Sequence, residues 1–164
     1  MTEQKQADFE TLVQLHRPII FKTANTYCWR VEDREDLAQD IYAHLWRAWP
    51  KYDASRPFST WMYRIALNVA ISFVRREVQR RRVFTPLEED VQDTNSVLPN
   101  DPDAASKVRR LNRFVAGEPP LERALLLLYL EDTPQKEIAE ILGITPTNVS
   151  TKINRLKQRI RAEL

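Results

Sequence analysis

Aromatic side chains and arginines occur together in the stretch RPFSTWMYRIALNVAISFVRR, which runs from Arg56 to Arg76. Aromatic rings stack on unpaired nucleobases and guanidinium groups bind phosphates, so this combination is typical of surfaces that hold single-stranded nucleic acid. Taking a base out of a duplex costs a few kcal/mol, which a pocket must recover through stacking and hydrogen bonds. The short polar loop KYDASR, residues 51–56, could frame such a pocket.

The same stretch must form a helix that packs on its neighbours. Apolar residues four positions apart predict one buried face, made of Trp61, Ile65, Val69 and Phe73. We assign these four residues to the core. The other faces are then shared by the candidates for nucleic-acid contact and one leucine, namely Phe58, Ser59, Thr60, Tyr63, Arg64, Leu67 and Asn68.

A helix-turn-helix is predicted near the end of the chain. Thr133–Pro134 and Thr145–Pro146 each supply the N-cap and first-turn proline that begin a helix, and Gly143 would end the first helix. In the second helix the residues predicted to be buried are Val149, Ile153, Leu156 and Ile160. Its polar face suits the major groove of DNA and consists of Thr147, Asn148, Ser150, Thr151, Lys152, Asn154, Arg155 and Gln158. The alternative is a plain surface helix.

An acidic segment precedes the aromatic one. Residues 32–40, EDREDLAQD, hold five acids and one arginine. No metal-ligand pattern fits them, since His44 stands apart from the cluster. They suit a docking face for a basic protein surface, although acids at the start of a helix also simply oppose its dipole. Asp33 is the predicted N-cap of this helix, which would stop at Pro50.

Several function classes are excluded by what the sequence lacks. Cys28 is the only cysteine, so neither a disulfide framework nor a thiolate cluster can form. There is no Gly-rich phosphate loop, no HExxH motif and no serine with a base near it, and His16 and His44 are isolated. We therefore expect no enzyme, no metal and no cofactor. With no signal peptide and no apolar run of membrane-spanning length, we expect a cytoplasmic protein that does not insert into membranes.

The spacing of apolar residues predicts an all-α fold of two small helical domains joined by a flexible acidic linker. Only two glycines occur, Gly117 and Gly143, which disfavours strand-rich folds. The stretch VFTPLEEDVQDTNSVLPNDPDAA has prolines and acids but almost no periodicity. We predict domains at residues 1–82 and 105–164, with the linker at 83–104. In the first domain, Pro18 is expected to kink or restart a helix.

Three blocks in this order resemble the extracytoplasmic-function (ECF) sigma factors of bacterial RNA polymerase. DREDLAQDIYAHLW is similar to the family's block that docks on the clamp helices of the polymerase β′ subunit. RPFSTWMYRIALNVAISFVRR is similar to the block that melts and reads the −10 element. LERALLLLYLEDTPQKEIAEILGITPTNVSTKINRLKQRIR is similar to the domain that binds the −35 element and the β flap. The resemblance covers nearly the whole chain and is weakest in the linker.

The resemblance implies a non-enzymatic sigma factor and a role for particular residues. For core polymerase binding they are Asp36, Leu37, Gln39, Asp40, Trp46 and Arg47. For single-stranded −10 DNA they are Lys51, Ser55, Arg56, Phe58, Ser59, Thr60, Tyr63, Arg64, Asn68, Arg75 and Arg76. For duplex −35 DNA they are the polar residues of the predicted recognition helix, from Thr147 to Gln158. An anti-sigma factor is a further implied partner.

Some residues depart from the family pattern, and other functions stay open. Ser72 stands where family members usually have Asp, and the recognition helix has its own residues at Ser150, Lys152, Asn154 and Leu156. The family's common promoter sequence is therefore not assumed. One alternative is a helix-turn-helix regulator that acts without joining polymerase. Another is a DNA-processing enzyme such as a recombinase, for which candidate catalytic residues are lacking.

Overall fold

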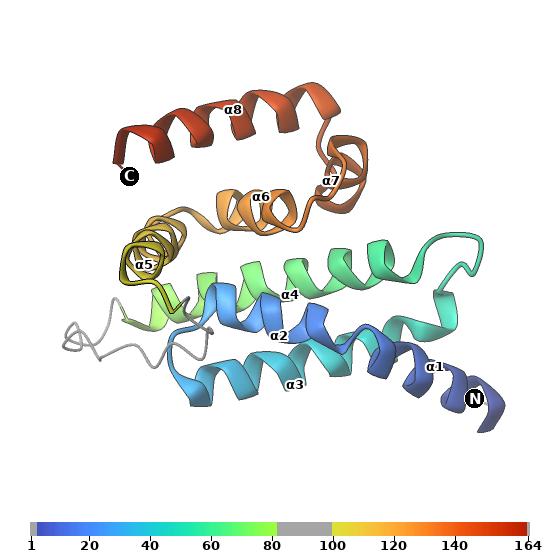
Figure 1. Ribbon diagram of the computed structural model, residues 1–164. Helices are drawn as coiled ribbons and strands as arrows, with labels where there is room; N and C mark the ends of the chain where they lie inside the picture. Colours follow the sequence, from blue (N-terminus) through green and yellow to red (C-terminus); the bar gives the residue numbers. More distant parts are fainter. Residues whose placement is uncertain (1–2, 82–99, 164) are drawn as a thin grey trace. The chain divides into compact units, whose positions relative to one another are not determined.

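Regular secondary structure is helical throughout the residues that the computed structural model describes, 3–81 and 100–163 (Figure 1). The chain divides into two compact units, Met1–Val91 and Gln92–Leu164. The prediction of an all-α protein with two helical domains is confirmed. Most of the predicted linker, residues 83–99, lies outside the described residues. Residues 102–104 of it belong to a helix, and the domain limits 1–82 and 105–164 stay predictions.

The first unit contains α1 (Glu3–Leu15), α2 (Arg17–Tyr27), α3 (Val31–Ala48), the short 3₁₀ helix η1 (Trp49–Lys51) and α4 (Phe58–Arg81). Helices α2, α3 and α4 pack against one another (Figure 1). Pro18 restarts the helix as predicted, because α1 ends just before it and α2 begins at Arg17. The prediction of Asp33 as N-cap is wrong: α3 begins at Val31, and Asp33 lies in its first turn, where a carboxylate opposes the helix dipole.

The buried face of α4 differs from the predicted one. Val69 is buried, but Trp61, Ile65 and Phe73 are only half-buried. The residues that α4 buries most deeply are Met62, Ala66, Leu67 and Ala70. Positions 62, 66 and 70 are also four apart, one residue further along than the predicted series, so the period was correct and the face was not. Since α4 contacts both α2 and α3, the small alanines allow close approach, and the larger side chains lie at the edges.

The second unit contains α5 (Pro102–Ala116), α6 (Pro120–Leu130), α7 (Gln135–Leu142) and α8 (Pro146–Glu163). Asp101 caps α5 by accepting a hydrogen bond from the Asp103 amide at 3.1 Å. The apolar helix α6 buries five successive residues, 124–128. This is possible because α5, α7 and α8 all pack against it. Helix α6 is therefore the centre of this unit's core.

The helix-turn-helix forms at α7 and α8, largely as predicted. Gly143 ends α7 with φ of 70°, and the Ile144 amide donates to Ala139 O at 3.2 Å in the 6→1 pattern of a Schellman motif. Thr145 caps α8, since its Oγ1 accepts from the Asn148 amide at 3.1 Å. Thr133 is not the cap of α7, which begins at Gln135 after Pro134. The Thr133 amide instead donates to Leu128 O at 3.1 Å and closes the end of α6.

Replacing Asp132 with glycine is expected to stabilise the second unit by about 1 kcal/mol. Asp132 has φ of 57°, the only positive value among the described non-glycine residues. It occupies the left-handed position at the end of α6 that glycine adopts without steric conflict. Urea denaturation should show the gain. Glu131→Gly is the matched control: its φ is −87°, so there glycine should destabilise. A loss of stability in Asp132→Gly would contradict the assignment.

Candidate functional site

The predicted docking residues on α3 separate into an exposed set and a core residue. Asp36, Gln39 and Arg47 are exposed, while Asp40 and Trp46 are partly buried. Asp36 makes no hydrogen bond or ion pair with another described residue. The expectation that Leu37 contacts a partner is wrong, because its side chain is 0% exposed and lies in the core.

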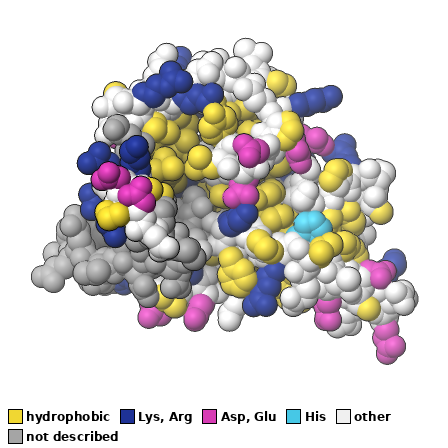
Figure 2. Space-filling view, in the orientation of Figure 1, with side chains coloured by type: hydrophobic (Ala, Val, Ile, Leu, Met, Phe, Trp, Pro, Cys, Tyr) yellow, Lys and Arg dark blue, Asp and Glu magenta, His cyan; other side chains and the backbone are white. Residues whose placement is uncertain are grey.

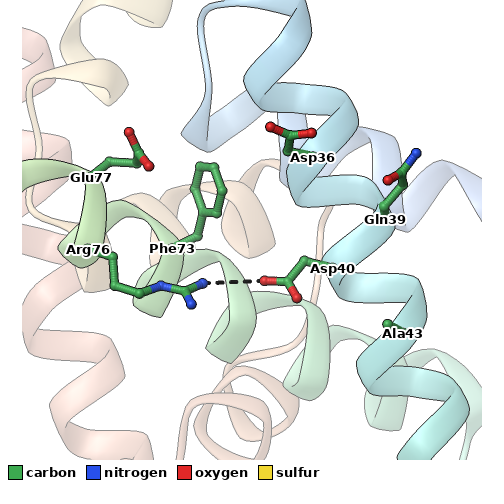
Figure 3. A pocket seen from close by; sticks show the side chains of 7 residues that line it. All are labelled: Asp36, Gln39, Asp40, Ala43, Phe73, Arg76 and Glu77. Atoms are coloured by element: carbon green, nitrogen blue, oxygen red, sulfur yellow. Dashed lines mark hydrogen bonds and ion pairs between the residues drawn. The ribbon is translucent and has the colours of Figure 1, made fainter. Parts of the chain in front are cut away.

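Asp36 and Asp40 line a groove between α3 and α4, which we call the acidic groove. Figure 3 shows the side chains that line it, Asp36, Gln39, Asp40 and Ala43 from α3 and Phe73, Arg76 and Glu77 from α4. Its volume is about 580 Å³. Phe73 and Glu77 were not among the predicted site residues. Only the antiparallel packing of α3 and α4 brings them beside the acidic segment.

Within this groove, an ion pair links a residue predicted to bind DNA with a residue predicted to bind polymerase. Arg76 Nη2 lies 3.4 Å from Asp40 Oδ2, and His44 Nδ1 lies 3.5 Å from Asp40 Oδ1. Arg76 was predicted to bind DNA and Asp40 to bind polymerase. Because the Arg76 side chain is 64% exposed, the pair contributes little stability, roughly 0–1 kcal/mol. Either residue can therefore leave the other for a binding partner at small cost.

The loop before α4 is ordered by its own hydrogen bonds. Asp53 Oδ1 accepts from the Ser55 amide at 3.0 Å and from Ser55 Oγ at 2.7 Å. The Arg56 amide donates to Asp53 O at 3.1 Å, and Tyr52 Oη donates to Arg56 O at 2.9 Å. Lys51, Ser55 and Arg56 are all exposed on this loop. The loop thus presents its polar groups in a fixed arrangement before any ligand binds.

Two of the candidates on α4 are not available for contact. Phe58 is 6% exposed and Thr60 is 8% exposed, so the expectation that they lie on an open face is wrong. The Phe58 ring packs among other rings, 5.3 Å from Trp61 and 5.0 Å from His16. Arg64, Asn68, Arg75 and Arg76 are exposed, and Ser59 and Tyr63 are partly exposed.

Replacing Asp53 with alanine is expected to make the loop before α4 less ordered. The hydrogen bonds from Ser55 lower the pKa of the Asp53 carboxyl below its usual value of 3.8. Because the folded-state pKa is depressed, the carboxylate's contribution to loop order is complete above that usual value. It is lost as the pH falls through the lowered pKa. We expect the hydrogen-exchange protection of the Ser55 amide to be constant from neutral to mildly acidic pH and to fall severalfold in Asp53→Ala.

The control for this prediction is Asp53→Asn. Its side-chain oxygen still accepts hydrogen bonds but does not titrate, so protection should survive and lose its dependence on acid pH. Equal protection in wild type and Asp53→Ala would show that the carboxylate does not order the loop.

Helix α8 presents most of the predicted recognition residues to solvent. Thr147, Asn148, Thr151, Asn154, Arg155 and Gln158 are exposed, and Ser150 is half-buried. In the space-filling view, Lys and Arg side chains are prominent at the top, where α8 lies (Figure 2). Val149, Ile153 and Leu156 are buried as predicted, while Ile160 is half-buried. The face left by the core is therefore polar and partly basic, as a groove-reading helix requires.

Two ion pairs tie α8 to the rest of its unit. Lys152 is half-buried with its Nζ 3.4 Å from Glu122 Oε1, and its role as a DNA contact stays a prediction. Arg159 donates to both carboxylate oxygens of Glu118, at 2.8 and 2.7 Å, and Glu118 is only 4% exposed. Hydrogen bonding and then the negative charge of Glu118 raise the pKa of the Arg159 guanidinium. These contacts fix the direction of α8.

Two further properties concern the described residues only. No three His, Cys, Asp or Glu side chains among them lie close enough together to hold a metal ion. None of the described helices combines the length and apolar character that crossing a membrane would require.

The two units match two family descriptions in order. Residues 12–81 match "Sigma-70 region 2" and residues 119–160 match "Sigma-70, region 4". The ECF RNA polymerase sigma factor SigW of Bacillus subtilis is 28% identical over 97% of this chain and 90% of its own. The sigma factor CnrH of Cupriavidus metallidurans is 25% identical over 97% of this chain and 87% of its own. The chain belongs to the sigma-70 family, among its ECF RNA polymerase sigma factors.

Solved structures share the fold. The sigma factor RpoE of Bartonella quintana, in complex with the anti-sigma factor NepR, matches with a TM-score of 0.76 and 15% identity over 94% of this chain and 95% of its own. CnrH in complex with the cytosolic domain of CnrY matches with a TM-score of 0.63 and 22% identity, over 96% and 87%. The family is one of transcription initiation factors, and the regulator that acts without polymerase is not favoured.

Proposed function

We propose that the chain binds core RNA polymerase and directs it to promoters by holding a duplex −35 element and a single-stranded −10 element. The observation that carries this proposal is the presence in one chain of a capped helix-turn-helix and a separate unit with an ordered polar loop and an acidic groove. A regulator that acts alone needs only the first. Polymerase, not this chain, performs the catalysis, and the chain needs no cofactor or metal.

Each proposed contact is assigned to side chains that are accessible. The β′ clamp helices dock on α3, through Asp36, Gln39 and Asp40 at the acidic groove and through Trp46 and Arg47 further along the helix. The single-stranded −10 DNA is held by the loop and α4, through Lys51, Ser55, Arg56, Ser59, Tyr63, Arg64, Asn68, Arg75 and Arg76. The −35 duplex receives α8, through Thr147, Asn148, Ser150, Thr151, Lys152, Asn154, Arg155 and Gln158. The second unit also binds the β flap.

We further propose that an anti-sigma factor holds the chain inactive. The similarity to an RpoE that was solved with the anti-sigma factor NepR supports this. The chain would act in the cytoplasm, on the nucleoid when active, since polymerase and promoter DNA are found there.

In vitro transcription tests the proposed function. Bacterial core polymerase is combined with the chain and genomic DNA fragments, and the 5′ ends of the transcripts are mapped. New start sites that share two upstream elements are expected only when the chain is present. Absence of such sites, together with no stoichiometric complex in a pull-down with core polymerase, would favour the separate regulator. DNA cleavage or joining by the purified chain would support the alternative of a recombinase.

A further inference from the structure

Much of the positive charge on α8 is engaged by contacts inside the second unit. The helix carries five basic residues, Lys152, Arg155, Lys157, Arg159 and Arg161. Lys152 and Arg159 pair with carboxylates, and Lys157 Nζ lies 4.8 Å from the centroid of the Tyr129 ring. Arg155 is exposed and has no partner among the described residues. The helix predicted to read DNA therefore offers phosphates less charge than its composition suggests.

The pair between Arg159 and Glu118 has the geometry of a permanent anchor. Both terminal nitrogens of Arg159 donate to Glu118, at 2.8 and 2.7 Å, and the Glu118 side chain is only 4% exposed. The Arg159 guanidinium also lies over the Phe114 ring, 5.1 Å from its centroid. Bidentate pairs of this kind are strong and fixed in direction. We expect Arg159 to stay with Glu118 when DNA binds.

The pair between Lys152 and Glu122 is much looser. It consists of one contact of 3.4 Å, and the two side chains are 28% and 24% exposed. The ammonium group of lysine is a point charge on a flexible stem, so it can turn to another acceptor without losing a fixed geometry. A pair with this exposure is broken at small cost. Lys152 can therefore exchange Glu122 for another anion.

Lys152 lies beside the face of α8 that is predicted to read DNA. Asn148 precedes it by four residues and Arg155 follows it by three, so the three side chains are neighbours on the helix surface. Both neighbours are exposed. Helices α6 and α8 pack against each other (Figure 1), and Glu122 lies in the first turn of α6. Its carboxylate offers Lys152 the same charge-assisted hydrogen bond as a phosphate. Glu122 thus competes with DNA for this cation.

We propose that Glu122 is a specificity-determining residue of the −35 reader. It holds Lys152 away from the phosphates of unrelated DNA, and Lys152 leaves it only where the other residues of α8 hold the helix in register in the major groove. The inference rests on the proposed binding of the −35 duplex. Affinity for unrelated DNA comes from phosphate contacts, so withholding one cation lowers that affinity without changing base readout. Specificity, the difference between the two affinities, increases.

The test uses holoenzyme made from the full chain and bacterial core polymerase, so core contributes equally in every variant. The probes are a labelled duplex of random sequence and a labelled duplex with the two upstream elements found by transcript mapping. Glu122→Gln should bind the random duplex about fivefold more tightly, and the slope of log affinity against log salt should steepen by about 0.9, the contribution of one phosphate contact. The slope on the promoter duplex should not change, because Lys152 already contacts DNA there.

A second variant gives the complementary result. Lys152→Gln should reduce the slope on the promoter duplex by about 0.9 and leave binding of the random duplex unchanged. Asp103→Asn is the matched control, since it removes the same charge from an exposed position in the first turn of α5. It should match wild type on both probes. A variant that only disturbs the fold would weaken binding to both duplexes, which is the opposite of the result expected for Glu122→Gln.

Each outcome decides the inference or the function beneath it. If Glu122→Gln binds the random duplex no more tightly than wild type, or with the same salt slope, Glu122 does not withhold Lys152 and the inference is wrong. Equal strengthening in Asp103→Asn would mean that net charge governs binding and would also overturn it. If wild-type holoenzyme binds the promoter and random duplexes equally well, promoter recognition itself fails, and with it the proposed function.

Discussion

Replacing Asp36 with arginine is expected to weaken association with core RNA polymerase about 100-fold or more. Asp36 is exposed at the acidic groove and has no partner among the described residues. A charge reversal there removes an attraction to a basic surface and adds a repulsion. The fold should be unaffected, because the side chain packs on nothing that the core needs. Affinity is measured by titrating labelled chain with core polymerase at fixed salt.

The matched control for this prediction is Glu10→Arg. It makes the same charge change at an exposed helical position of the same unit, away from the acidic groove. It should alter affinity only slightly. Equal weakening by both variants would mean that net charge, and not the groove, governs binding. If Asp36→Arg binds core polymerase as tightly as wild type does, α3 is not part of the docking surface.

Replacing Phe9 with alanine is expected to destabilise the first unit by about 3–5 kcal/mol. Phe9 is 0% exposed, and its ring centroid lies 5.2 Å from that of Trp46 and 5.4 Å from that of Trp49. Its removal leaves a cavity among rings that cannot easily collapse. It also removes the ring that supports Trp49. Urea denaturation followed by tryptophan fluorescence measures the loss.

Leu15→Ala provides the comparison, since Leu15 lies on the same helix but is 72% exposed. A loss within about 0.5 kcal/mol is expected there. If the two variants were equally stable, α1 would not be held to the unit through Phe9.

The helix-turn-helix could be predicted from the sequence because its determinants are local. Gly143 and Thr145 act within one turn of their own positions, and the stripe from Val149 to Leu156 needs only the helical period. The prediction that Thr133 caps α7 was wrong for a local reason as well. Two helices adjoin there, and the closing motif of α6 takes the residue that would otherwise cap α7.

The faces of α4 and the partners of charged residues could not be predicted, because they depend on packing between helices. The two series of apolar positions on α4 share one period, so only contact with α2 and α3 decides between them. Lysine is a residue type that often contacts DNA, which is why Lys152 was predicted to do so. Its position beside Glu122 follows from how α8 packs on α6. The acidic groove joins residues far apart in sequence, and so does the hydrogen bond from Trp49 Nε1 to Lys5 O.

In the unbound protein, the ion pair between Asp40 and Arg76 brings the opposite charges of these two side chains together. If polymerase binds Asp40 and DNA binds Arg76, each partner must break the same ion pair. Only the partner that binds first loses binding free energy by breaking it. Thermodynamic reciprocity then requires each partner to raise the affinity for the other by an equal factor. An exposed pair of this kind limits that factor to about fivefold. The order of assembly would thus leave the final complex unchanged while altering which intermediate is populated.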